Sequence, residues 1–383
     1  MLVLFFKNTL EQQLIYILPG LFGFFLLIQL YYILVVYSRL RNYKIPDLEA
    51  DFDYPPLSVI ICARNEEANL RLYLSEILEQ DYPVYEVIVV NDCSSDDTKW
   101  VLKEFQGRYK HLRSVLITED ERFKLGKKFA VTMGIKGAQY EHLVFTDADC
   151  FPQSNQWLKH LGRQFTPGKE IILGYSPYIA TKGLLNKYIR FETYQTALHY
   201  LSFALKRNAY MGVGRNLAYT KTLFFKGKGF ASHMHILSGD DDLFVNQNAT
   251  RKNVAICIHP DAMVWSNPKT TYKEYKLQKK RHFGAAKAYR TKHKIALSIQ
   301  AASTVLFYLF AVLLLLLQPE FWYVALGGYV LRLLLLAIIC IPIMKRLQVG
   351  KLVWWLPVMD IFHAVYICIK GIGARFKKDV QWK

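Results

Sequence analysis

The chain has 383 residues, enough for one large or two modest domains, and its 52% hydrophobic content exceeds the average of soluble proteins. Its 49 Lys and Arg residues outnumber its 31 Asp and Glu residues by 18, which suits nucleic acid, an anionic membrane surface or a phosphate-rich substrate as partner. The six cysteines are far apart and form no Cys-X-X-Cys pair, which disfavours a zinc ribbon or a disulfide framework.

The first long apolar segment, residues 14–37, contains no charged residue. At helical rise it is long enough to cross a bilayer, and it is too long for the core of a signal peptide. Three basic residues follow directly: Arg39, Arg41 and Lys44. The positive-inside rule therefore places the next domain in the cytosol and the N-terminus outside. We expect a membrane anchor over residues 1–41 and a polar linker over residues 42–56.

From residue 57 onward, short apolar runs alternate with helical patterns. The apolar runs are LSVIICA (57–63), EVIVV (86–90) and RSVLIT (113–118), and the expected helices cover residues 67–79 and 97–109. This alternation predicts an α/β domain with a mostly parallel sheet, whose functional side chains lie at the carboxyl ends of the strands. We expect this domain to cover residues 57–268.

Polar residues stand where that rule expects them. The segment EHLVFTDADC (141–150) is an apolar strand that ends in Asp147 and Asp149. Two carboxylates so spaced can hold a hard divalent cation that also takes phosphate oxygens, and an ordinary solvated turn is the alternative. The first two strands are followed by Arg64, Asn65, Glu66, Asn91 and Asp92. Carboxyl ends of parallel strands share one edge, so we expect these groups to line a single crevice.

Seven segments, in this order, resemble the family 2 glycosyltransferases, which are nucleotide-sugar enzymes of the A-type fold. The segments are SVIICARNE (58–66), VIVVNDCSSDDT (87–98), LGKKFAVTMGI (125–135), FTDADC (145–150), GVGRNLAY (212–219), SGDDDLFVNQ (238–247) and QKKRH (278–282). The resemblance covers residues 57–283. It implies a Rossmann-like sheet with transmembrane helices before and after it, and sugar transfer from a nucleoside diphosphate.

The resemblance also implies roles for the matching positions. Asp240 matches the catalytic base, and Asp241 is the adjacent acid to which that role could shift. The implied donor-binding residues are Ala63, Arg64, Glu66, Asp92, Lys127, Asp147, Gln278 and Arg281. The implied acceptor-binding residues are Gly214, Asn216 and His282. Asp149, together with Asp147, would hold Mg²⁺ or Mn²⁺.

The carboxylates have structural alternatives. Asp92 can accept a hydrogen bond from a pyrimidine N–H, or it can be an acid near a helix N-terminus. Crowding of the three acids at positions 240–242 raises the pKa of at least one of them, which suits a general base. A helix cap or a calcium loop is the alternative for this cluster.

The basic motif residues are open to a second interpretation as well. Lys127 can place a point charge on the diphosphate, whereas its neighbour Lys128 is equally compatible with a solvated position. Gln278 and Arg281 share a helical face that can grip a diphosphate, or they belong to a basic surface helix. His282 stands where processive synthases resembling this chain have a Trp, which disfavours a long-glycan acceptor.

Residues 269–294 carry ten Lys or Arg residues against a single acid, Glu274. Because this basic segment directly precedes an apolar run, it predicts an interfacial helix that faces anionic lipid headgroups. A nucleic-acid partner is not expected, since no groove-reading or base-stacking module accompanies the charge.

The remaining residues, 295–383, predict membrane-embedded helices. Residues 295–317 and 321–344 are expected to form a transmembrane hairpin, and Arg332 within it should face protein or a lipid headgroup. Residues 352–369 are apolar but have basic residues on both flanks, so we expect an in-plane or re-entrant helix there.

The sequence therefore predicts an integral protein of the bacterial inner membrane with a cytosolic catalytic domain. We expect a metal-dependent, hexosyltransferase-like inverting enzyme that moves one sugar from a nucleotide-sugar, with a UDP-sugar favoured, to a hydroxyl of a lipid or lipid-linked acceptor. The alternatives are a processive synthase of a surface polysaccharide, a catalytically inactive membrane scaffold, and a membrane-tethered nucleic-acid binder.

Overall fold

The computed structural model describes residues 15–49, 51–118, 126–236 and 238–373. The chain divides into two compact units. One contains residues 43–290 with the short segment 346–348, and the other contains the long apolar helices. All six cysteines are free thiols.

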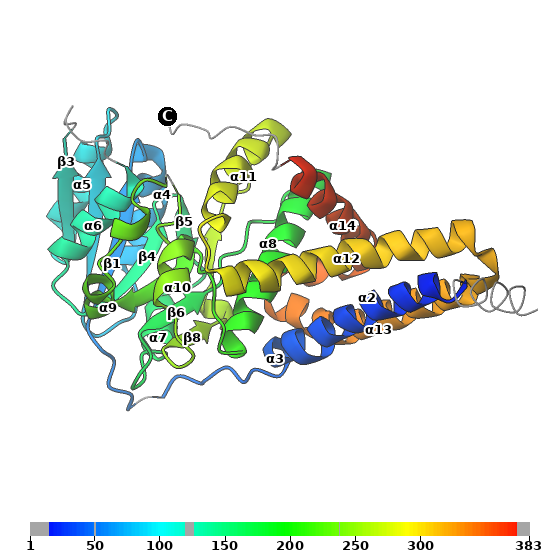
Figure 1. The fold of residues 1–383 in the computed structure, drawn as a ribbon. Coiled ribbons are helices and arrows are strands. Elements are labelled where there is room, and N and C mark those ends of the chain that lie inside the picture. The colour runs from blue at the N-terminus through cyan, green and yellow to red at the C-terminus, as the bar shows by residue number, and fades with distance from the viewer. Residues whose placement is uncertain (1–14, 50, 119–125, 237, 374–383) are drawn as a thin grey trace, which may run out of the picture. The chain divides into compact units, whose positions relative to one another are not determined.

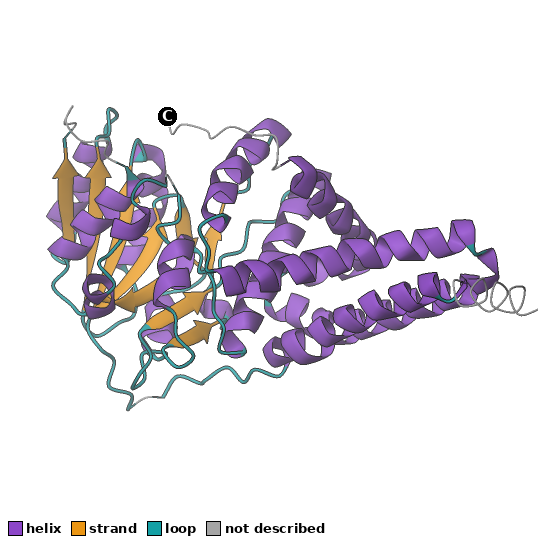
Figure 2. Ribbon diagram, in the orientation of Figure 1, coloured by secondary structure: helices purple, strands orange, loops and turns teal. Residues whose placement is uncertain are grey.

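A seven-stranded sheet organises the first unit (Figure 2). The strands of this unit are β1 (Leu57–Ala63), β2 (Tyr85–Asp92), β3 (Leu112–Ile117), β4 (His142–Asp147), β5 (Cys150–Pro152), β6 (Ile171–Gly174), β7 (Leu217–Thr220), β8 (Val254–Cys257) and β9 (Val264–Ser266). The sheet has the order β3-β2-β1-β4-β7-β6-β8, and only β7 runs antiparallel to its neighbours. Strands β5 and β9 form a separate antiparallel pair. The predicted α/β class with a mostly parallel sheet is confirmed.

Helices cover both faces of this sheet (Figure 1). The helices of this unit are α4 (Glu67–Leu78), α5 (Thr98–Arg108), α6 (Lys127–Gly137), α7 (Trp157–Gly162), α8 (Leu184–Leu205), α9 (Lys221–Lys226), α10 (Asp242–Asn248) and α11 (Tyr272–Ala286), with 3-10 turns η2 (Gly214–Asn216), η3 (Ala231–His233) and η4 (Pro260–Ala262). Successive side chains of β1 point to opposite faces of the sheet, as in any strand. Val59 and Ile61 join a core with Leu70 of α4, whereas Ile60 meets α6, where a Cβ at Gly134 would lie 2.7 Å from it.

The strand order places a crevice at the carboxyl ends of β1 and β4. The chain winds from β1 through β2 to β3 and then returns to the other side of β1 as β4, so the winding direction reverses between β1 and β4. The loops after β1 and β2 are joined there. Asn65, with φ of +56°, accepts a hydrogen bond from the Ser95 backbone N–H at 2.8 Å, and its own N–H donates to Ser94 Oγ at 2.9 Å.

The second unit consists of long apolar helices. They are α2 (Ile17–Tyr31), continued by the π-helical η1 (Tyr32–Tyr37) and α3 (Ser38–Arg41), then α12 (Thr291–Leu317), η5 (Pro319–Phe321), α13 (Trp322–Arg346), η6 (Gly350–Trp355) and α14 (Leu356–Gly373). Among the described residues, four stretches are long and apolar enough to cross a membrane: Ile17–Arg41, Thr291–Leu317, Pro319–Arg346 and Gly350–Ile369. The expected hairpin corresponds to α12 and α13.

A buried polar cluster connects the four apolar stretches. Arg332 of α13, 3% exposed, donates to Asp360 Oδ2 of α14 at 2.6 Å and to Gln29 Oε1 of α2 at 3.1 Å. Gln29 Nε2 donates to Ser303 Oγ of α12 at 2.7 Å, and the Tyr308 hydroxyl donates to Asp360. The expectation that Arg332 faces protein is confirmed. Because unsatisfied polar groups are costly in an apolar medium, these bonds favour one arrangement of the helices.

Candidate active site

Two carboxylates and a thiol meet where β4 ends. Asp147 is the last residue of β4, and ligand atoms of Asp147, Asp149 and Cys150 lie within 4.8 Å of one another. Burial raises the pKa of the Cys150 thiol, which donates to Asp149 Oδ1 at 3.4 Å. The donor set is therefore two carboxylates beside a protonated thiol. Such oxygen ligands suit Mg²⁺ or Mn²⁺ better than a metal that selects thiolates.

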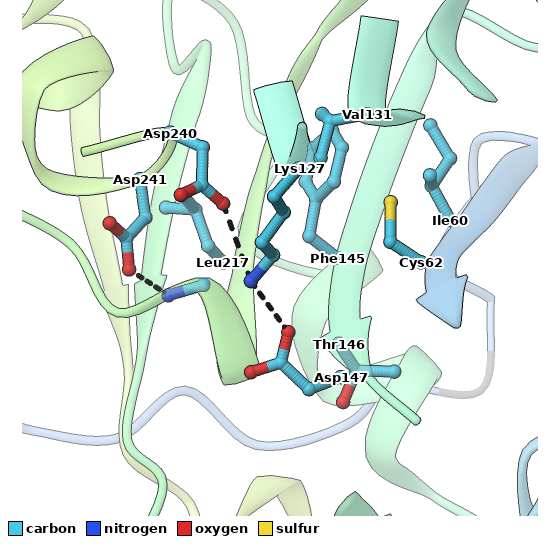
Figure 3. A pocket seen from close by; sticks show the side chains of 11 residues that line it. Ile60, Cys62, Lys127, Val131, Phe145, Thr146, Asp147, Leu217, Asp240 and Asp241 are labelled. Carbon is cyan, nitrogen blue, oxygen red and sulfur yellow. Dashed lines mark hydrogen bonds and ion pairs between the residues drawn. The ribbon is translucent and has the colours of Figure 1, made fainter. Parts of the chain in front are cut away.

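Lys127 connects this carboxylate pair to the acidic segment at positions 240–242. It is the first residue of α6, and its Nζ lies 2.8 Å from Asp147 Oδ1 and 3.4 Å from Asp240 Oδ2 (Figure 3). Burial by itself lowers the pKa of Lys127, but the carboxylates of Asp147, Asp240 and Asp241 outweigh it and raise that pKa well above its usual range. Lys127 is therefore a cation held between two acids that are 93 residues apart in sequence.

The three adjacent aspartates have different environments. Asp241 caps α10, since its Oδ1 accepts from the Asp242 N–H and its Oδ2 from the Gly214 N–H, both at 2.7 Å. Asp242 accepts from the Tyr289 hydroxyl at 2.7 Å. Burial, with the neighbouring carboxylates, raises the pKa of both Asp241 and Asp242. Asp240 and Asp241 both line the cleft, but the two oxygens of Asp241 already accept backbone N–H bonds, whereas Asp240 caps no helix and faces Lys127 (Figure 3). Asp240 is therefore the best placed of the three to receive a proton from a ligand.

Lys128 is not a solvated surface residue. Its side chain is buried, with 4% exposure, and its Nζ donates to the carbonyl oxygens of His233 at 2.6 Å and Ile236 at 2.8 Å. Burial lowers the pKa of Lys128 to about 8. Lys128 therefore fixes the segment that leads to Asp240.

Asp92 ends β2 with one oxygen buried and unsatisfied. Its Oδ1 has no hydrogen-bond partner among the described residues. Burial raises the pKa of Asp92, and the positive charge of Arg64 opposes that shift. The helix-capping alternative does not apply, because Asp97 stands at the N-cap of α5 and Asp96 accepts from the Thr98 N–H. A buried acceptor of this kind suits a ligand N–H.

Asn216 has a structural position. It is fully buried, and its amide donates to the carbonyl oxygens of Tyr175 at 2.9 Å and Ala262 at 2.8 Å while accepting from Trp157 Nε1 at 3.1 Å. With these bonds made inside the protein, the amide has no exposed atom for a substrate. This corrects the expectation that Asn216 binds the acceptor.

Gln278 of helix α11 contacts Tyr178. Gln278 Nε2 donates to the Tyr178 hydroxyl at 3.1 Å, and Thr271 with Glu274 forms a capping box at the start of the helix. The backbone of α11 includes positions 281 and 282, but the side chains of Arg281 and His282 lie outside the described part of the structure.

The two remaining motif residues lie near the end of β1. Ala63 is buried as the last residue of β1, and Glu66 stands at the N-cap of α4. Burial raises the pKa of Glu66, and the carboxylates of Asp149 and Asp147 add to that shift. The motif segments that follow β1, β2 and β4 therefore lie at one edge of the sheet.

Sequence reasoning missed two residues near this site, Tyr178 and Arg215. The Arg215 guanidinium lies over the Tyr178 ring, 4.3 Å from its centroid. Arg215 was visible only as the variable position of the GVGRN segment, and Tyr178 belongs to no motif. No sequence signal could have shown that the two side chains stack.

The fold is similar to that of a solved structure. Over 93% of its length the chain is similar to the mannosyltransferase PcManGT of Pyrobaculum calidifontis, which was solved in complex with GDP-Man and Mn²⁺. The similarity covers 99% of that chain, with 19% sequence identity and a TM-score of 0.56. At this identity the likeness concerns the fold.

Residues 58–228 match the model of glycosyl transferase family 2. Over these residues the chain is similar to the family 2 glycosyltransferases, as the motifs predicted. It is 37% identical over 107 residues to glycosyltransferase AglE of Haloferax volcanii, which is 27% of this chain and 34% of the relative. It is 31% identical over 150 residues to a 4,4'-diaponeurosporenoate glycosyltransferase of Staphylococcus aureus, covering 39% and 38%. These matches span little more than a third of the relatives' length.

Proposed function

We propose that the protein is an inverting glycosyltransferase that uses a nucleoside-diphosphate sugar, with a UDP-sugar favoured, at the cytosolic face of a membrane. The single observation that carries the proposal is the arrangement of Lys127 between Asp147 and Asp240. It puts a proposed diphosphate site and a proposed base on opposite sides of one cation. A sugar held there has its leaving group at one end and a proton acceptor at the other.

The proposed reaction is a single displacement. An acceptor hydroxyl gives its proton to Asp240 as its oxygen bonds to the anomeric carbon, and the bond from that carbon to the diphosphate oxygen breaks. Lys127 would stabilise the charge that develops on the departing diphosphate. Mg²⁺ or Mn²⁺ bound by Asp147 and Asp149 would supply further neutralisation of that group. Asp92 would accept an N–H from the nucleotide base.

The acceptor is proposed to be a lipid or lipid-linked hydroxyl compound. The four stretches long enough to cross a membrane and the basic segment of α11 support this choice. Part of the chain is similar to a 4,4'-diaponeurosporenoate glycosyltransferase of Staphylococcus aureus, whose name gives a lipid-like acceptor. We propose transfer of one sugar for each acceptor molecule.

The test uses the full-length protein in detergent with a panel of UDP- and GDP-sugars, with and without Mn²⁺. Turnover should need the metal and should fall at least 100-fold in Asp149→Ala and Asp240→Asn. Asp81→Asn is the matched control, because Asp81 forms an exposed ion pair with Lys159. Equal turnover in wild type and both site variants would refute the assignment. Product length on a defined lipid acceptor separates single transfer from processive synthesis.

A further inference from the structure

Arg215 is held in place within the turn η2, whose first residue, Gly214, lines the cleft. Its neighbours on both sides are fixed, since the Gly214 N–H donates to Asp241 and the Asn216 amide is bonded within the core. The guanidinium itself rests on the Tyr178 ring, and one of its nitrogens, Nη2, donates to the Ser176 carbonyl at 3.3 Å. This positioning leaves the guanidinium little freedom.

One nitrogen of the Arg215 guanidinium has no acceptor within the described part of the chain. This nitrogen, Nη1, is buried. A buried donor left unpaired costs about 1–3 kcal/mol, and more when the group is charged. A buried charged donor of this kind suits an acceptor that a ligand supplies.

The charges around Arg215 indicate the chemical class of this acceptor. Burial by itself lowers the pKa of Arg215, while Tyr178, Cys150 and the carboxylates of Asp147 and Asp149 raise it above its usual range. Arg215 is therefore a permanent cation near the two proposed metal-binding carboxylates. An anion with several oxygens, such as a phosphate, can accept from a guanidinium and also from a cation held by those carboxylates.

Tyr178 connects this arginine to helix α11. One face of its ring carries the guanidinium, its hydroxyl accepts from Gln278 Nε2, and its backbone bridges to Ser266 next to the β5–β9 pair. Gln278 belongs to the helix whose motif was expected to contact the diphosphate. Tyr178 therefore contacts both Arg215 and a residue of that motif, Gln278.

We propose that Arg215 binds the terminal phosphate of the nucleoside diphosphate, oriented by Tyr178, so that it stabilises the leaving group together with Lys127. The inference rests on the proposed function, because it assumes a diphosphate donor. It adds a cation that the family motifs do not assign. A phosphate carried by the acceptor lipid has the same chemistry, and the experiment distinguishes the two sources.

The experiment measures dissociation constants of full-length protein for UMP and UDP without metal, by calorimetry. Arg215→Gln should weaken UDP at least 10-fold while changing UMP less than 3-fold, because only the diphosphate offers the terminal phosphate. Arg215→Lys should give an intermediate loss, since it keeps the charge without the planar fork. Arg163→Gln is the matched control, because Arg163 lies over the Phe52 ring at 4.4 Å and pairs with Glu49.

Three outcomes overturn the inference. Equal losses for UMP and UDP would indicate a structural role, which a lowered melting temperature would accompany. Unchanged UDP affinity with a raised KM for a phosphorylated lipid acceptor would move the phosphate to the acceptor. Unchanged values for both would remove Arg215 from the site. Failure of the wild type to bind any nucleotide would instead overturn the proposed function.

Discussion

Replacement of Lys127 by Met should have opposite effects on metal affinity and on turnover. The lysine Nζ lies 2.8 Å from Asp147 Oδ1, so it opposes a second cation at that carboxylate. Two unit charges at 4 Å interact by about 1 kcal/mol in water and about 4 kcal/mol at an effective dielectric constant of 20. Both side chains are about one-third exposed, so we expect about 1–2 kcal/mol here. Lys127→Met should therefore bind Mn²⁺ roughly 5- to 30-fold more tightly in the absence of donor.

Turnover should change in the other direction. Loss of a positive group aimed at the leaving diphosphate is expected to lower kcat about 10²- to 10³-fold. Mn²⁺ affinity is measured by calorimetry and turnover by release of nucleoside diphosphate at saturating metal. Lys136→Met, an exposed lysine at the other end of α6, should change neither quantity. Weaker Mn²⁺ binding by Lys127→Met would refute the electrostatic reasoning, since it would mean that the lysine supports the metal site.

Three further changes test the environments described above. The pKa of Asp242 is raised in the folded protein, so folding favours its protonated form. This contribution to stability is complete below the unfolded pKa near 4 and is lost as the pH rises through the folded pKa. Asp242→Asn should therefore raise the melting temperature at pH 8 and not at pH 4. Burial and the neighbouring His259 lower the pKa of His160 to about 4. The free energy of unfolding should therefore fall by up to about 3 kcal/mol between pH 6.5 and pH 4. Denaturation at each pH should show a smaller fall in His160→Gln. Arg332→Ala should cost about 3–5 kcal/mol by leaving Asp360 buried and unpaired, and the double variant with Asp360→Ala should recover part of this loss in thermal unfolding.

The sheet and its polar edge could be predicted from the sequence because their signals are local. The apolar run LSVIICA coincides with β1, and Asp147 stands at the end of β4 as the alternation of strands and helices indicated. The carboxyl ends of parallel strands must share an edge, so their polar residues could be grouped without coordinates. The antiparallel β7 could not be foreseen in this way, because its four residues carry too short a pattern.

The environments of single side chains were beyond such reasoning. Asn216 and Lys128 both occur in motif segments, yet one is locked into the core and the other is buried against a loop more than 100 residues away in sequence. Both outcomes depend on contacts between residues distant in sequence, which a local pattern does not encode. The same holds for Arg215, whose stacking partner Tyr178 is 37 positions earlier.

The polar cluster around Arg332 has a consequence for how the apolar helices find one another. An apolar side chain such as leucine is as favourably placed against lipid tails as against another helix. Apolar surface alone therefore gives these helices little preference for one neighbour over another. The hydrogen bonds among Gln29, Ser303, Arg332 and Asp360 supply that preference. A chain without them should still insert into lipid, but its segments would have no fixed order of assembly, and a defect there would show as misassembly rather than as failure to reach the membrane.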